Sequence, residues 1–148
     1  MRQVKNLTIR VLLTAIVALL WSAGAAAQIV SAKARGGFDE VKDSLVLAIQ
    51  ARGLKIDHTS HIGNMLERTG RDVGSAKRVY GKAEAIQFCS AVVSRKMMER
   101  KAANIAFCPY VIALYTLPGG GNTVHVVYRK NLPEVDVLLA GIVKEAIE

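Results

Sequence analysis

The two cysteines of the chain, Cys89 and Cys108, have the most definite chemistry, and a phenylalanine precedes each of them. Two cysteines in an oxidising compartment tend to pair, and closing a loop of about 20 residues stabilises a fold by roughly 3 kcal/mol. A redox-active pair usually has the spacing Cys-x-x-Cys at a helix start, which lowers the thiol pKa. The wider spacing here favours a structural disulfide. The alternatives are a thiol-disulfide or sulfur-handling redox function of the same pair, and thiols that are unpaired or bound to a metal.

His58 and His61 are the second group of residues that could do chemistry. If this stretch is helical, their spacing of three places both side chains on one face, where they could chelate one metal ion. A third ligand would be needed, and His125, Asp57 and Met65 are the candidates. The alternative is a capping or hydrogen-bonded pair without a metal.

No group of residues in the sequence predicts catalysis. No serine lies in a Gly-x-Ser-x-Gly nucleophile elbow, and no pair of carboxylates is marked as a hydrolytic dyad. The three glycines at 119–121 lack the Lys-Ser or Lys-Thr of a phosphate loop, and they predict a hairpin turn instead. The sequence therefore assigns no catalytic residue and indicates no cofactor, and we expect a protein that is not an enzyme.

Residues 1–27 have the three parts of a secretory signal peptide. Three basic residues and no acidic ones precede an uncharged, mostly apolar run over residues 11–24, and Ala25-Ala26-Ala27 forms a small-x-small cleavage site. The run is shorter than the roughly 20 residues that a membrane-spanning helix needs. We therefore expect cleavage near Ala27, a periplasmic or secreted mature protein, and no stable membrane span after cleavage.

The mature protein, residues 28–148, has the length of one domain. The formal charge of +8 includes three basic residues of the signal peptide, so the mature excess is about +5. This excess suits an anionic partner, and it also suits plain solubility. Nucleic acid is not expected for an exported protein without aromatic-basic patterning. The partner is instead expected to be a small molecule or a protein of the cell envelope.

The periodicity of the apolar residues predicts the elements that position these side chains. On the return strand of a hairpin, Val124, Val126 and Tyr128 share one face, while His125, Val127 and Arg129 share the other. The expected elements are strands at 28–35, 54–59, 85–89, 105–117 and 123–130, and helices at 38–52, 62–68, 91–101 and from 133 onward. This order predicts an α+β sandwich with two main helices on one face of an antiparallel sheet.

Several segments together resemble the domain-of-unknown-function 302 family. They are Phe38-Asp39-Glu40-Val41, Arg52-Gly53-Leu54, Ile56-Asp57-His58, Val79-Tyr80-Gly81-Lys82-Ala83, Phe88-Cys89-Ser90, Phe107-Cys108-Pro109-Tyr110 and Val126-Val127-Tyr128-Arg129. The resemblance covers nearly all of the mature chain, and the two Phe-Cys segments look like an exported branch of the family. It implies a compact α+β fold similar to one half of the TATA-box-binding protein, and a homodimer. It carries no established activity and no DNA binding.

The sequence thus predicts a small exported binding or accessory protein with a disulfide-stapled α+β fold. A groove between the sheet and the helices, or a dimer interface, would hold the ligand. The candidate lining residues are His58, Tyr110, Tyr128 and Arg129. Because Asp57-His58 falls on a segment of the family resemblance, His58 ranks above His61.

Overall fold

The computed structural model describes residues 28–75 and 77–148. The predicted signal peptide, residues 1–27, lies outside these residues. The strands are β1 (Ile29–Arg35), β2 (Lys55–Ser60), β3 (Ala83–Cys89), β4 (Tyr110–Tyr115) and β5 (Thr123–Arg129). The helices are α2 (Phe38–Gln50), α3 (Ile62–Thr69), α4 (Ala91–Arg100) and α5 (Pro133–Ile147), and a 3-10 helix, η1 (Ala102–Phe107), follows α4.

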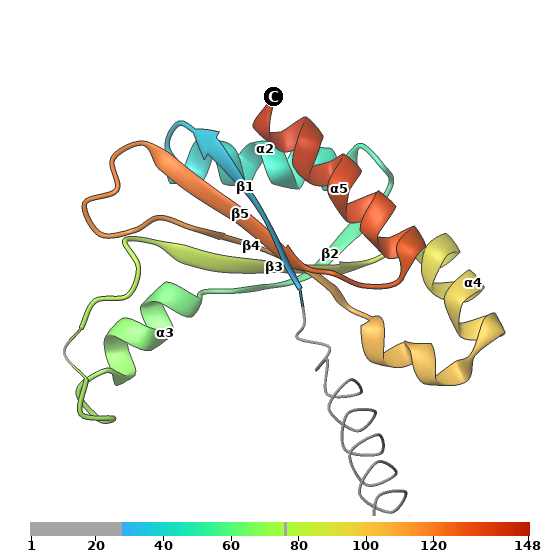
Figure 1. The fold of residues 1–148 in the computed structure, drawn as a ribbon, viewed down its shortest axis with the longest axis horizontal. Helices are drawn as coiled ribbons and strands as arrows, with labels where there is room; N and C mark the ends of the chain where they lie inside the picture. Colours follow the sequence, from blue (N-terminus) through green and yellow to red (C-terminus); the bar gives the residue numbers. More distant parts are fainter. Residues whose placement is uncertain (1–27, 76) are drawn as a thin grey trace, which may run out of the picture.

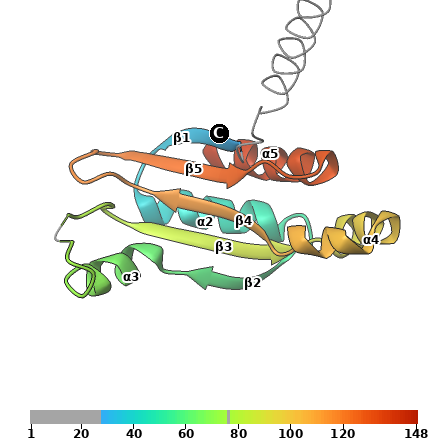
Figure 2. The ribbon, with the colours of Figure 1, turned by 60° about the horizontal axis from the view of Figure 1, so that its bottom comes forward.

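The five strands form one antiparallel sheet in the order β1-β5-β4-β3-β2. Helices α2 and α5 pack side by side on one face of this sheet, and the other face is turned forward in Figure 2. The α+β class predicted from the sequence, with two main helices on one face, is therefore confirmed. None of the helices among residues 28–75 and 77–148 has the length and apolar character needed to cross a membrane.

Helix α2 begins and ends where local chemistry allows it. The backbone N–H of Gly37 donates to the Glu40 carboxylate at 3.2 Å, which satisfies an N–H group at the helix start that has no partner within the helix. Beyond the helix end, Gly53 has a φ of +69°, a backbone conformation that is unfavourable for residues with a side chain. Between these ends, Val41, Leu45 and Ile49 fall on one side of the helix and are buried against the sheet.

Helix α5 closes the same layer. Pro133 occupies the first turn, where its missing N–H costs no hydrogen bond. The apolar residues of the two helices meet those of the central strands in one core, in which Leu45, Ile86, Ile112, Val126 and Leu139 have no exposed surface. The space between the sheet and the helices is therefore filled by side chains.

One predicted strand is wrong in its first part. Residues 105–107 belong to η1, and β4 starts only at Tyr110. Pro109 has no N–H to donate to a neighbouring strand, so the ladder begins after it. The Asn104 side chain also donates to the backbone oxygen of Met97 at 2.9 Å, which folds η1 back on α4. Cys108 consequently lies between η1 and β4, whereas both cysteines were expected on strands.

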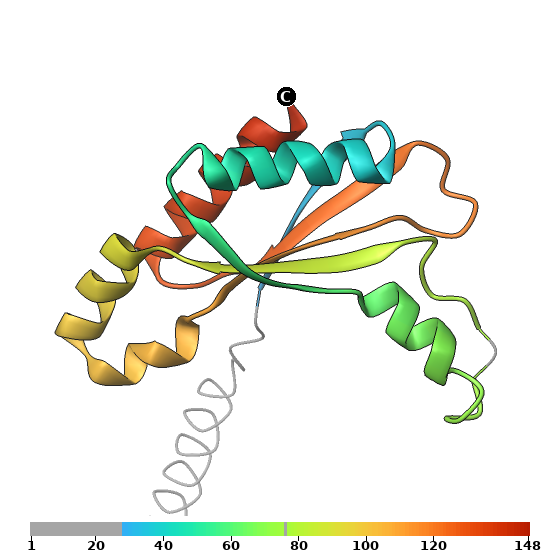
Figure 3. The ribbon, with the colours of Figure 1, turned by 180° about the vertical axis from the view of Figure 1, so that it is seen from behind.

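Two further segments extend from the ends of the sheet. Figures 1 and 3 show α3 at one end and the α4–η1 unit at the other, with both α3 and η1 reaching beyond the side of the sheet that α2 and α5 leave bare. Gly63 allows α3 to approach β3, since a Cβ there would lie 2.9 Å from the backbone nitrogen of Ala83. At the start of α4, the Ser90 hydroxyl accepts from the Val93 N–H at 3.3 Å.

Candidate functional site

The face of the sheet opposite α2 and α5 is the candidate site, and we call it the open face. Strand alternation assigns to it the outward residues of each strand. Its centre is a row of small side chains, in which Ala113 pairs with Ala85 on one side and Val127 on the other. All three are only half-buried. Ser31 and Ser60 continue this row onto the two edge strands.

The open face carries positive charge. Its outward positions include Lys33, Arg35, Lys55 and Arg129, and no aspartate or glutamate. None of these four cations forms an ion pair with another residue of the described chain. Asp57 sits in a bulge of the edge strand β2, with two strands between it and β5. A cationic face without interspersed carboxylates favours an anionic ligand.

One end of the open face is hollowed, and we call this cavity the Arg129 hollow. Its volume is about 290 Å³, close to the lower limit of ordinary small-molecule pockets. The lining residues come from β1, β4, β5, η1 and the segments next to them, and they include Ile29, Ala106, Phe107, Pro109, Val111, Ala113, Val127, Arg129, Lys130 and Asn131. No acidic residue is among those that line it.

The opposite end of the open face is aromatic. The Tyr115 ring stacks on the His125 imidazole, with ring centroids 4.6 Å apart and planes only 3° from parallel. Tyr80 packs against Tyr115 at 5.3 Å. His125, a candidate third metal ligand, is therefore engaged with an aromatic ring on β4, whereas His58 lies on the edge strand β2 beyond β3.

The predicted lining residues fall on different faces of the sheet. Arg129 and His58 are on the open face, about 14 Å apart across three strand spacings. The rings of Tyr110 and Tyr128 belong to the core on the helix side, where they are 1% and 7% exposed. Burial raises the pKa of the Tyr128 hydroxyl above its ordinary value, and the nearby Asp136 carboxylate adds to this effect. Both tyrosines border the Arg129 hollow, but their rings point away from it.

The two histidines considered as metal ligands lie on different elements. His58 is in strand β2, within the strand expected at 54–59, and His61 precedes α3, so the condition for a shared helical face is not met. The Nδ1 atom of His61 lies 3.2 Å from the Glu84 carboxylate, which also lies 3.5 Å from the Lys42 ammonium group. Within the two described ranges, no three His, Cys, Asp or Glu side chains come together in a way that could hold a metal.

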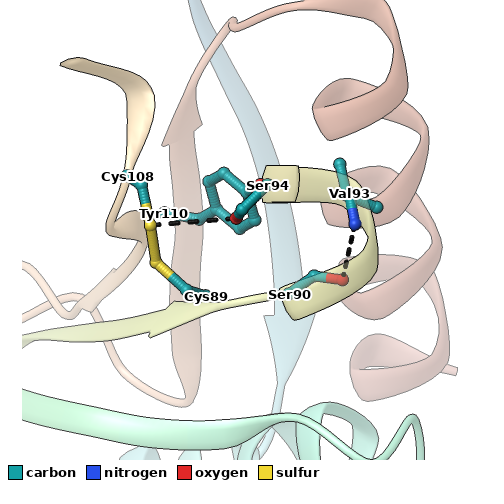
Figure 4. Close-up of a disulfide and its surroundings, with 6 residues drawn as sticks. All are labelled: Cys89, Ser90, Val93, Ser94, Cys108 and Tyr110. Atoms are coloured by element: carbon teal, nitrogen blue, oxygen red, sulfur yellow. Dashed lines mark hydrogen bonds between the residues drawn. A yellow bond between two sulfur atoms is a disulfide. The ribbon is translucent and has the colours of Figure 1, made fainter. Parts of the chain in front are cut away.

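The two cysteines are joined, as Figure 4 shows. The disulfide Cys89–Cys108 links the end of β3 to the segment between η1 and β4, with Cα atoms 6.3 Å apart. Beside it, the Ser94 hydroxyl is 2.8 Å from the Tyr110 hydroxyl and 3.8 Å from the Cys108 sulfur. The bond fixes the chain directly after η1, which forms one wall of the Arg129 hollow.

Sequence reasoning missed the floor of the open face, because Ala85, Ala113 and Val111 carry no reactive group. The alternation that placed His125, Val127 and Arg129 on one face of the return strand was the available signal. This alternation correctly placed His125 and Val127 on the same face as Arg129. The sheet register shows which residues of β4 and β3 lie beside them on that face.

The fold and the site define a two-layer α+β protein with one bare, cationic sheet face. No family model and no curated protein matches the sequence. Among solved structures, the fold is similar to the crystal structure of an uncharacterized conserved protein, DUF302, from Bacillus stearothermophilus. The TM-score is 0.58, and the match covers 80% of this chain and 86% of that chain. Since the identity is 13%, this likeness concerns the fold.

Proposed function

We propose that this chain is an exported, non-enzymatic binding protein that holds its ligand on the open face of the sheet. The Arg129 hollow carries the proposal, because it combines a cationic rim, an apolar floor and no carboxylate. Apolar pockets with a few polar groups are the usual sites of small-molecule binding. Export agrees with the predicted signal peptide and with the pairing of Cys89 and Cys108.

The packing of the core supports the open face over a groove between the sheet and the helices. Leu45 of α2 and Leu139 of α5 are fully buried, and so are the residues of β4 and β5 that face them. A ligand in that layer would have to displace well-packed side chains, which is costly. The outward side chains of the same strands, including Val127, stay half-exposed.

Chemical-shift mapping of the mature protein, residues 28–148, tests the binding proposal. A library of anionic, neutral and cationic small molecules is titrated into labelled protein. We expect anionic compounds to perturb the amides around Val111, Val127 and Arg129, and to leave the outer surface of α2 unchanged. Turnover of a compound that is lost when one polar residue is replaced would contradict a non-enzymatic role.

The intact mass of protein recovered from the envelope tests cleavage near Ala27.

Membership of an exported branch of the domain-of-unknown-function 302 family, and a homodimer, are part of the same proposal. The structural likeness and the sequence segments support the family, and the half-exposed Ala113 and Val127 give a second copy a surface to cover. Sedimentation equilibrium of the mature protein measures the dimer. A dimer that shifts the side-chain methyl resonances of Val127 and prevents every compound from binding would mean that the open face is an interface and not a ligand site.

A further inference from the structure

The Arg129 hollow has an apolar strip on one side and a charged rim on the other. Val111, Ala113 and Val127 form the strip on two neighbouring strands, and Phe107 of η1 and Ile29 of β1 stand at its sides. Val111, Ala113 and Tyr115 are successive outward residues of β4, and they extend from the hollow towards the other end of the open face. Neighbouring outward residues of a strand are about 7 Å apart. A slender apolar group could therefore lie along this strip and end near the stacked rings.

The polar groups at the rim are engaged within the protein, with one exception. The Lys130 ammonium donates to the Gln28 side chain at 3.3 Å. The backbone N–H of Asn131 donates to the Asp136 carboxylate at 2.6 Å, and its side chain donates to the backbone oxygen of Arg129. The guanidinium of Arg129 makes no hydrogen bond or ion pair with another described residue, and Arg129 is exposed at the hollow. It is thus the cation of the rim that has no hydrogen-bond partner, whereas the Lys130 ammonium has one neutral partner.

We propose that the ligand of the Arg129 hollow is a single-chain amphiphile with a carboxylate head, such as a medium-chain fatty acid. The carboxylate pairs with the fork of N–H donors of Arg129, and the chain lies on Val111, Ala113 and Val127. The volume of about 290 Å³ suits one slender chain. This inference rests on the proposed function and adds the chemical class of the ligand.

Titration calorimetry of the mature protein with octanoate, decanoate and dodecanoate, each below its micellar concentration, tests the ligand class. Burying a methylene contributes about a factor of four in affinity. We expect each pair of added methylenes to tighten binding about fifteenfold. Decanol and decyltrimethylammonium should bind at least tenfold more weakly than decanoate, because they cannot pair with Arg129. Acetate and inorganic phosphate should not bind measurably.

Two substitutions test where the carboxylate head and the alkyl chain of the ligand bind. Arg129→Gln removes the pairing cation from an exposed position, and we expect it to weaken decanoate binding about tenfold or more. Arg71→Gln is the matched control, since it removes the same charge from an exposed turn outside the open face and should leave binding unchanged. Ala113→Phe should shorten the apolar strip, so that dodecanoate binds no better than octanoate.

The outcomes separate this inference from the proposed function. If decanoate does not bind while another compound perturbs the amides near Val127, the proposed ligand class is wrong and the proposed binding function stands. If no compound perturbs the open face, both are wrong. Decanoate binding that is unaffected by Arg129→Gln and Ala113→Phe would overturn the assignment to the hollow. Binding to phosphatidylglycerol vesicles, without binding of any free amphiphile, would identify an anionic membrane surface and overturn the single-chain ligand.

Discussion

The buried hydroxyl pair next to the disulfide allows a stringent test of the structure. Ser94 Oγ and Tyr110 Oη are 2.8 Å apart, and the two residues are 9% and 1% exposed. Ser94→Ala leaves the tyrosine hydroxyl buried without its partner, which costs about 1–3 kcal/mol. Tyr110→Phe leaves the serine hydroxyl with only the Cys108 sulfur at 3.8 Å, a weak acceptor, so the cost should be about 1–2 kcal/mol.

The double variant distinguishes a hydrogen bond from two independent losses. When both oxygens are removed, no polar group is left unsatisfied, and we expect a total loss of only about 1 kcal/mol. The coupling energy is then about 1–4 kcal/mol. Urea unfolding at 25 °C, with the disulfide intact, measures all three variants. Tyr115→Phe is the control, because this hydroxyl makes no hydrogen bond with a described residue. Losses that add within about 0.3 kcal/mol would refute the pairing.

Three further predictions concern the disulfide, two glycines and acid. Replacing Cys89 and Cys108 together by alanine should lower the free energy of unfolding by about 3 kcal/mol, for a separation of 19 residues; a reduction potential above about −200 mV would instead favour the redox role. Gly63→Ala should destabilise the protein, because its Cβ would lie 2.9 Å from the Ala83 nitrogen, whereas Gly141→Ala, with its nearest contact at 3.6 Å, should stabilise it by about 0.5–1 kcal/mol in thermal melts. Hydrogen bonds from Lys82 and Arg100 lower the pKa of Asp39 and Glu134 below their ordinary values of 3.8 and 4.5. Both carboxylates therefore contribute stability above those values and lose it as the pH falls through the lowered ones. Lys82→Gln with Arg100→Gln should flatten the loss of stability below about pH 4.5 in acid titration, and an unchanged slope would contradict both pairs.

The main elements could be predicted because their apolar residues repeat with one clear period. Val41, Leu45 and Ile49 on α2 follow the helical period, and Val124 and Val126 on β5 follow the strand period. Such patterns depend only on neighbours in the sequence. Together with the order of the elements, they were enough for the α+β class and for the helical layer on one face.

The errors arose where contacts distant in sequence decide the local structure. Residues 105–107 are apolar and include a β-branched residue, a composition typical of a strand. Their conformation is instead set by the Asn104 bond to Met97 and by the tie between Cys108 and Cys89. The shared face of the two histidines required a helix that contains both, although residues 54–59 were expected to form a strand. The sheet register shows His58 in β2, paired with Gln87.

The site was predictable in part for the same reason. The alternation on the return strand predicted that Tyr128 shares a face with Val126 and that Arg129 shares the other face with Val127. The structure confirms this division. It could not tell which face the helices cover, because that depends on how α2 and α5 pack. The candidate residues His58, Tyr110, Tyr128 and Arg129 were therefore chosen from both faces. Of these four, only Arg129 and His58 lie on the open face, and they are about 14 Å apart.

The positions of the cations on the open face decide which of them indicates a ligand. Lys33 and Arg35 lie on β1 and Lys55 lies on β2, and these are the two edge strands of the sheet. Charged side chains on edge strands prevent pairing with other chains, so these three residues need no ligand to explain them. Arg129 is the last residue of β5, a strand with a neighbouring strand on each side, and it pairs with Ile29 of β1. Edge protection does not account for a cation there, at the rim of an apolar hollow without carboxylates. For this reason the binding proposal depends on Arg129 in particular, and Lys33→Gln should leave decanoate affinity unchanged where Arg129→Gln lowers it.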